Sequence, residues 1–193
     1  AKEASMLLFV HTYGVENEFD YFFQKVKEVN SEIVIVDDKC LCMPNLLVEE
    51  SIADLVLYST GAKKMVDLCD GAIGYVADQW EYNEIEVEPN AYLNNERWLL
   101  DAKQLYIKMD AMIVHKEKLN AIYRQMLPSD IQLPDAYQHW RFNILTEKKD
   151  EILKALFSEG LFASNHYKSL SNDCIIAYTL HEHVLNVFND QYY

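Results

Sequence analysis

Residues 6–36 read MLLFVHTYGVENEFDYFFQKVKEVNSEIVIV, and this stretch decides the fold class. Its ends, Met6 to Val10 and Ile33 to Val36, are short apolar runs without alternation, which is typical of strands buried on both faces. Between them, apolar side chains recur at helical spacing from Phe19 to Val29. A strand, a helix and a strand in this order predict the βαβ unit of a parallel sheet. Asp54 to Tyr58 predicts a third strand of the same kind.

The middle of the chain predicts a domain boundary followed by a long helix. Residues 77–89 are polar and acidic, so we expect two domains, residues 1–88 and residues 89–193. From Trp98 to Met126, apolar residues repeat at helical spacing until Pro128 stops them, which predicts a helix of about 30 residues.

The last third of the chain predicts a small α+β domain attached to this helix. Trp140 to Leu145 predicts a strand, Lys148 to Ser158 a helix that Gly160 closes, and Val184 to Phe188 a final element. The predicted fold class is therefore α/β. It combines part of a large domain, with a mostly parallel sheet and helices, and a small α+β C-terminal domain joined by the long helix.

Charge and composition exclude several classes of protein. The 193 residues contain 17 Lys and Arg against 31 Asp and Glu, a formal charge of −14, so the chain would repel nucleic acid or an anionic membrane surface. The apolar run Met6–Val10 is far shorter than the roughly 20 residues that span a bilayer. Four cysteines in a chain of this size predict free thiols. The sequence predicts a soluble, cytoplasmic protein.

Two candidate ligand loops follow the second and third predicted strands. Parallel sheets bind ligands at the carboxyl ends of their strands. Asp37 and Asp38 follow the second strand, either as ligand-binding carboxylates or as solvated turn and capping residues. Residues 59–64, with the sequence STGAKK, follow the third strand, and their hydroxyls, glycine and lysines suit a bound phosphate. Lys63 and Lys64 are equally consistent with surface lysines.

Other candidates carry a weaker signal. His181 and His183 would share a face of a strand, but no third metal ligand accompanies them, so we expect no metal site. Cys40 and Cys42 lack a second pair of cysteines, which favours packing over redox chemistry.

Six short segments together resemble one enzyme family. They are HTYG at residues 11–14, IVDD at 35–38, LYSTGAKK at 57–64, WRF at 140–142, ASNHY at 163–167 and NVFND at 186–190. In this order they resemble the DegT/DnrJ/EryC1/StrS family of pyridoxal-phosphate-dependent sugar aminotransferases, of fold-type I, over its C-terminal half. The resemblance covers nearly the whole chain.

The resemblance implies a pyridoxal phosphate site in the first domain. Lys64 matches the lysine that condenses with the cofactor aldehyde, then moves a proton as general base and acid. Asp38, rather than Asp37, matches the carboxylate that keeps the pyridine nitrogen protonated. Ser59 matches a hydroxyl donor to the cofactor phosphate.

The resemblance also implies substrates and partners. We expect transfer of an amino group from glutamate or a similar donor to a nucleotide-linked keto sugar, as in polysaccharide biosynthesis, by a homodimer or with a partner fragment. His166 and Tyr167 would contact substrate or form a structural pair. Arg141 would bind a substrate carboxylate or phosphate, or form a salt bridge in the small domain.

The sequence departs from the family pattern at several positions. Leu41 stands where the family has Gln or His, Ala72 interrupts a double glycine, and Asn94 and Asn95 match the stretch before the long helix only loosely. The family's N-terminal half, which supplies a phosphate-binding turn and a stacking aromatic, has no counterpart ahead of Ala1, so the sequence matches the C-terminal piece of such an enzyme. A second hypothesis follows, in which the chain is a truncated, non-catalytic relative that serves as a binding or structural module.

Overall fold

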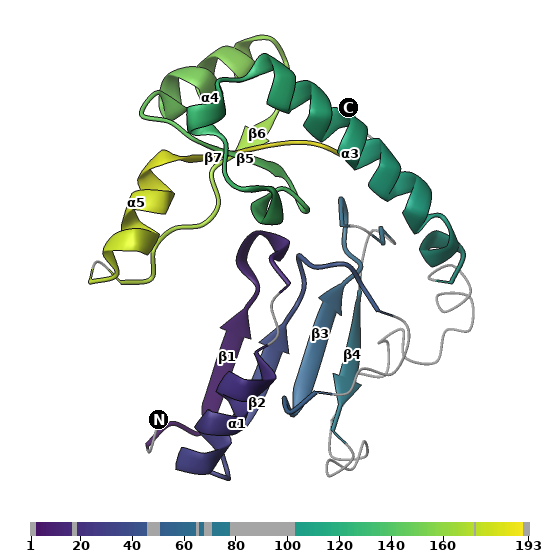
Figure 1. Ribbon diagram of the computed structural model, residues 1–193, viewed down its shortest axis with the longest axis vertical. Coiled ribbons are helices and arrows are strands. Elements are labelled where there is room, and N and C mark those ends of the chain that lie inside the picture. The colour runs from purple at the N-terminus through teal and green to yellow at the C-terminus, as the bar shows by residue number, and fades with distance from the viewer. Residues whose placement is uncertain are drawn as a thin grey trace. The chain divides into compact units, whose positions relative to one another are not determined.

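The computed structural model describes two compact units, each of which is treated by itself (Figure 1). The described residues are 3–16, 19–45, 51–64, 66–67, 71–77, 103–171 and 173–190. Unit 1 comprises Ala1–Asp110 and unit 2 comprises Ala111–Tyr193. The predicted boundary at residues 88 and 89 lies outside the described residues.

Unit 1 contains the predicted parallel sheet. Strands β1 (Met6–Val10), β2 (Val34–Asp38) and β3 (Leu55–Ser59) run parallel in this order, and helix α1 (Asp20–Val29) connects the first two. The βαβ prediction is confirmed. A fourth strand, β4 (Ala72–Val76), pairs antiparallel with β3 and was not predicted.

The two faces of this sheet differ in cover. Odd and even residues of a strand point to opposite faces. Phe23 of α1 packs against one face in a buried cluster with Ile35 of β2 and Val56 of β3. The other face of β1 exposes Met6 and Leu8, whose side chains are 58% and 57% exposed. The core of unit 1 therefore lies on the α1 side of the sheet.

Unit 2 is a small α+β unit, as predicted. Its antiparallel sheet has the strand order β5–β7–β6. Phe142 and Leu185 of this sheet are fully buried and form its core with Ala163, packed against Tyr123 and Leu156. The elements are α3 (Met109–Met126), the 3-10 turns η4 (Ser129–Ile131) and η5 (Asp135–Tyr137), β5 (Phe142–Leu145), α4 (Lys149–Ser158), β6 (Ala163–Ser164), α5 (Ile175–His183) and β7 (Val184–Val187).

Two sequence predictions are wrong in unit 2 and at its edge. The predicted long helix is not one uninterrupted helix in the described part of the chain, because residues 103–107 are helical and a turn at Lys108 precedes α3. His181 and His183 lie on helix α5 and not on a strand, so residues two apart do not share a face there.

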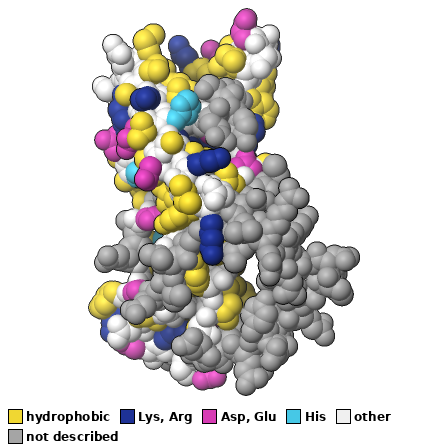
Figure 2. Space-filling view, turned by 90° about the vertical axis from the view of Figure 1, so that its right-hand side faces the viewer, with side chains coloured by type: hydrophobic (Ala, Val, Ile, Leu, Met, Phe, Trp, Pro, Cys, Tyr) yellow, Lys and Arg dark blue, Asp and Glu magenta, His cyan; other side chains and the backbone are white. Residues whose placement is uncertain are grey.

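None of the helices in the described ranges combines the length and the apolar character that crossing a lipid bilayer requires. On the face drawn in Figure 2, the described lysine and arginine side chains are scattered and do not gather into one patch.

Candidate functional site

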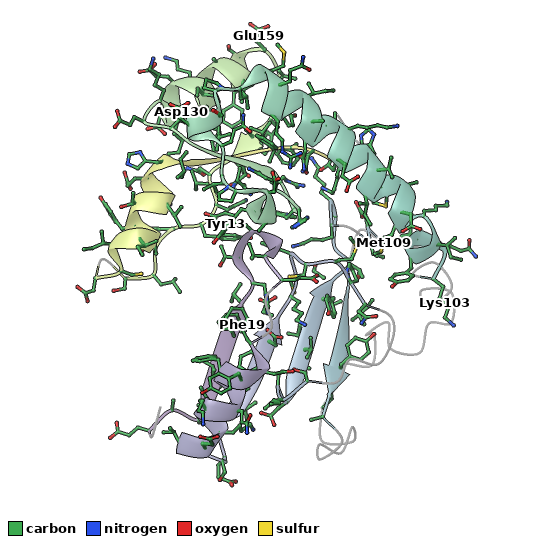
Figure 3. The ribbon with its side chains drawn as sticks, in the orientation of Figure 1. Tyr13, Phe19, Lys103, Met109, Asp130 and Glu159 are labelled. Atoms are coloured by element: carbon green, nitrogen blue, oxygen red, sulfur yellow. The ribbon has the colours of Figure 1, made fainter. Side chains whose placement is uncertain are left out.

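The carboxyl ends of β1, β2 and β3 bring the predicted loops of unit 1 to one edge of the sheet. The three arrows point the same way in Figure 1. The turn η1 (Thr12–Gly14) follows β1, and Figure 3 shows Tyr13 in this turn. Residues 39–42 follow β2 and residues 60–64 follow β3, so ligand-binding side chains from three loops can meet at this edge.

Asp38 and Ser59 lie on the same face of the sheet. Asp38 is paired with Leu57 in the parallel register of β2 and β3, and Ser59 comes two residues after Leu57. Oδ1 of Asp38 accepts a hydrogen bond of 2.9 Å from the Cys40 amide. Oγ of Ser59 accepts one of 3.3 Å from the Gly61 amide. Both side chains are therefore oriented by the backbone that follows their own strand.

Lys64 lies at the end of the tight turn after β3. Its amide nitrogen is 3.2 Å from the Gly61 carbonyl oxygen, to which it donates a hydrogen bond. Lys64 is half-buried, whereas Lys63 is exposed, has a positive φ of 63° and donates its amide to Asp67 at 2.7 Å. The two neighbouring lysines thus have distinct surroundings.

The thiol of Cys40 lies between the loop that carries Asp38 and the strand that leads to Lys64, since its Sγ atom is 3.9 Å from the Leu57 carbonyl oxygen. The pKa of Cys40 is raised to about 12, mainly by burial and also by a hydrogen bond to Asp38 and the charge of Asp38, while the charge of Lys64 lowers it. A single side chain therefore senses both a carboxylate and an ammonium group. The structure therefore places the three predicted cofactor residues, Asp38, Ser59 and Lys64, at or just after the carboxyl ends of two adjacent strands.

Cys40 and Cys42 have the character of packing residues. Both are free thiols, and burial is the main cause that raises the pKa of each. A thiol kept protonated in this way is a poor nucleophile and a poor redox group. The third described cysteine, Cys174, is free and exposed.

Asp37 points to the opposite face of the sheet from Asp38. It is 3% exposed, and its Oδ1 atom lies 2.7 Å from Nε2 of His11, which is also 3% exposed. Sequence reasoning missed His11 as a partner of Asp37. The signal was available in the predicted βαβ unit, because a residue just past the first strand lies beside the residues at the end of the second.

Arg141 lies inside unit 2. It is 3% exposed, and its Nη1 atom lies 3.2 Å from Oδ2 of Asp190. Its guanidinium group lies 4.0 Å from the centroid of the Phe188 ring and 4.8 Å from that of Trp140. Of the two roles that the sequence left open, the structure shows the internal salt bridge.

His166 and Tyr167 belong to an aromatic cluster in unit 2. The ring centroids of His166 and Tyr167 are 5.0 Å apart, and those of Trp140 and Tyr167 are 6.3 Å apart in a stacked arrangement. The His166 amide donates a hydrogen bond of 2.8 Å to Oδ1 of Asn186. Both residues are exposed, and they lie in a different unit from Lys64.

The departures from the family pattern occupy definite places in unit 1. Leu41 is 7% exposed and has no group that could hydrogen-bond a ligand. Ala72 is paired with Ser59 where β3 and β4 run antiparallel. Asn94 and Asn95 lie outside the described residues. Within the described ranges, no group of three His, Cys, Asp or Glu residues could hold a metal ion.

The structure is similar to solved structures of sugar-modifying enzymes. A DegT DnrJ EryC1 StrS aminotransferase from Brucella abortus matches 96% of this chain at 14% identity, with a TM-score of 0.67. A putative sugar aminotransferase from Streptococcus pneumoniae in its PMP form matches 100% of it at 13% identity, with a TM-score of 0.65. The GDP-4-keto-6-deoxy-D-mannose-3-dehydratase of E. coli with bound hydrated PLP matches 99% at 14% identity, with a TM-score of 0.64.

These likenesses establish the fold. No protein-family model and no curated protein matches the sequence. The chain spans 59%, 64% and 64% of the lengths of the three solved chains, respectively. The predicted fold, part of the DegT/DnrJ/EryC1/StrS aminotransferase fold with a mainly parallel sheet, is therefore confirmed.

Proposed function

We propose that the chain is part of a pyridoxal-phosphate-dependent aminotransferase of the DegT/DnrJ/EryC1/StrS type. It would transfer an amino group from glutamate or a similar donor to a nucleotide-linked keto sugar. One observation carries the proposal: Asp38 and Ser59 lie on one face of the sheet at the ends of two adjacent parallel strands, and the turn after Ser59 ends at Lys64. The shared fold with sugar aminotransferases supports the same conclusion.

The residues at this edge fit the chemical groups of the cofactor. When bound, pyridoxal phosphate supplies an aldehyde for covalent attachment and a ring that accepts electrons. Asp38 would hold a proton on the pyridine nitrogen, because a carboxylate favours the charged form of a base beside it. The Ser59 hydroxyl accepts a hydrogen bond from Gly61, which leaves its own hydrogen to donate to a phosphate oxygen.

Lys64 would carry the chemistry. Its amine would bind the cofactor covalently in the resting enzyme. Once displaced by the amino donor, the Lys64 amine would take a proton from the substrate carbon and deliver it to C4′ of the cofactor. Lys64 is half-buried, in contrast to the exposed Lys63.

The proposal extends to substrate contacts and assembly. His166 and Tyr167 are exposed aromatic side chains that would contact the substrate. Arg141 would contribute to substrate binding indirectly, by supporting the Trp140 ring that its guanidinium group contacts, because its charge is already paired with Asp190. By resemblance to the family, the protein would act in the cytoplasm, either as a homo-oligomer or with a partner fragment.

The proposal is tested by following the first half of the reaction, in which the amino group passes from the donor to the bound cofactor. The protein is saturated with pyridoxal phosphate, and L-glutamate is added while the absorption of the bound cofactor is followed. We expect the aldehyde band to convert to that of the aminated cofactor, with stoichiometric formation of the keto acid. Lys64→Arg should abolish conversion and Asp38→Asn should slow it at least about a hundredfold.

The neighbouring lysine provides the matched control. Lys63→Arg should convert at the rate of the unaltered protein. Conversion that survives Lys64→Arg, or that is lost equally in Lys63→Arg, would contradict the assignment of Lys64.

A second function has one structural observation in its favour. Leu41 places a buried aliphatic side chain at the position where the family has Gln or His. This favours a non-catalytic relative that serves as a binding or structural module. Absence of any cofactor spectrum with the unaltered protein would select this second function over the first.

A further inference from the structure

A buried pair of titratable residues lies directly beside Asp38. His11 follows β1 and Asp37 is the penultimate residue of β2, and both are 3% exposed. Nε2 of His11 lies 2.7 Å from Oδ1 of Asp37. Asp37 and Asp38 are consecutive in one strand, so the pair lies on the face of the sheet opposite to the Asp38 side chain.

The surroundings of His11 favour its protonated form. Nδ1 lies 2.9 Å from the Val15 carbonyl oxygen, which can only accept a hydrogen bond, and Nε2 faces the Asp37 carboxylate. Only the doubly protonated ring donates to both. Burial lowers the pKa of His11, but the hydrogen bonds to Asp37 and Val15 outweigh burial, and the pKa is raised above 6.5.

The same histidine also holds the backbone of Asp38. The His11 amide donates a hydrogen bond of 3.0 Å to the Asp38 carbonyl oxygen. On the other side, the Lys39 amide donates one of 2.8 Å to the Leu57 carbonyl oxygen. His11 thus binds Asp37 through its ring and Asp38 through its main chain, so a shift of His11 displaces both acidic residues.

We propose that His11 is a positioning residue for the cofactor site: its protonated ring, bonded to Asp37, fixes the end of β2 so that Asp38 faces the cofactor, and cofactor affinity falls when this ring loses its proton. This inference rests on the proposed function and adds a pH dependence to it. His11 lies on the opposite face of the sheet from the cofactor residues and touches no cofactor atom itself.

The direction of the pH effect follows from the sign of the shift. A histidine whose pKa is raised in the folded protein stabilises the folded state fully below the unfolded pKa of 6.5. This stabilisation disappears as the pH rises through the folded pKa. Asp37 of β2 and Lys39, whose Nζ lies 3.8 Å from Oδ2 of Asp37, are the charged groups that act on His11 among the described residues. The rings of Phe9 and Phe19 pack against it. The contribution of His11 to cofactor affinity should therefore be largest at low pH and disappear at high pH.

The test compares cofactor affinity in the unaltered protein and in His11→Gln across about pH 6 to about pH 9. Gln can donate one hydrogen bond to Asp37 but does not titrate. We expect about tenfold weaker binding in the variant at the acid end, the effect of one charge-assisted hydrogen bond, with the ratio approaching one at the alkaline end. Because Lys64 and the cofactor titrate identically in both proteins, the ratio isolates His11.

Three further measurements keep the test decisive. His139→Gln alters an exposed histidine of unit 2 and should leave the affinity unchanged at every pH. In the unaltered protein, an NMR titration of the His11 ring should show deprotonation at the pH where affinity falls, which requires no variant. Asp37→Asn, which removes the partner charge, should lower that NMR midpoint.

Each outcome bears on a different claim. Cofactor binding with an affinity ratio that does not change with pH, or a His11 midpoint at or below 6.5, would overturn this inference and leave the proposed function standing. No binding by the unaltered protein at any pH would overturn both.

Discussion

The two units bury charged side chains in opposite ways. Among its described residues, unit 1 buries two carboxylates, Asp37 paired with His11 and Asp54 paired with Lys27, and leaves Asp38 half-buried at the strand end. Among its described residues, unit 2 buries three cations, Lys116, Arg141 and Lys149, and one carboxylate, that of Asp190. Unit 1 thus has a half-buried carboxylate at a strand end, where a ligand could reach it. Unit 2 uses its buried charges to support its own interior.

Lys116 shows how unit 2 uses its polar groups. Its Nζ atom donates hydrogen bonds of 3.1 Å to the Trp140 carbonyl oxygen and 2.8 Å to Oδ1 of Asn189. Burial and the charge of Arg141 lower its pKa to about 8, while Asp190 acts in the opposite direction. These bonds tie α3 to the segments before β5 and after β7, so the network serves the fold of the unit.

Breaking the buried pair of unit 2 should have the largest effect. Arg141→Met leaves the Asp190 carboxylate buried without its principal counter-charge, and we expect a loss of about 3–5 kcal/mol in the free energy of unfolding. Urea unfolding of the unaltered protein and of Arg141→Met measures this loss. The matched control is Arg124→Met, which breaks the exposed pair with Asp135 and should cost no more than about 1 kcal/mol. Equal losses in the two variants would mean that Arg141 does not support the unit.

The lowered pKa of Lys116 should give unit 2 a pH dependence opposite to that of the His11 pair. Between about pH 8 and pH 10.5 the unfolded chain binds more protons at this residue than the folded one, so stability rises with pH. The expected gain is about 2–3 kcal/mol. Thermal unfolding should show it in the unaltered protein and not in Lys116→Met. If stability rises equally with pH in Lys116→Met, the gain belongs to another titratable group and the assignment to Lys116 is wrong.

Backbone strain should give the smallest effect and sharpen the comparison further. In the described part of unit 2 the positive φ of 73° after α4 falls on Gly160, whereas in unit 1 positive φ values fall not only on Gly14 and Gly71 but also on Tyr13 and Lys63, both in loops at the candidate site. We expect Gly160→Ala to cost about 1 kcal/mol and Lys63→Gly to be neutral or stabilising by less than about 1 kcal/mol. Urea unfolding measures both. Destabilisation by Lys63→Gly would show that the lysine is not strained there.

The sequence predicted elements that its own periodicity specifies. The apolar runs and the spacing from Phe19 to Val29 were sufficient for β1, α1 and β2, and they placed Asp38 at a strand end. Strand β4 contains Gly74, which is unfavourable in a strand, and it is specified by its pairing with β3, where a Cβ at Gly74 would lie 3.4 Å from Leu57. Pairing of this kind is not visible in the strand's own residues.

Helix α5 and the His11–Asp37 pair were missed for different reasons. Ile175 and Ile176 are β-branched, favour strands and are both about three-quarters exposed, so α5 lacks the apolar face by which a helix is recognised. His11 and Asp37 are 26 residues apart, and only the parallel register brings them together. Sequence reasoning found Asp38 and Ser59 on one face of the sheet, and it missed the pairing of His11 with Asp37 on the other face.

One measurement tests the central claim most directly. The protein is incubated with pyridoxal phosphate, reduced with borohydride and digested, and the labelled peptide is mapped by mass spectrometry. The account predicts a single stoichiometric label on Lys64, retained in Lys63→Arg and lost in Lys64→Arg. A label on Lys63 or scattered over surface lysines, or no label at all, would contradict the assignment of Lys64 as the residue that binds the cofactor.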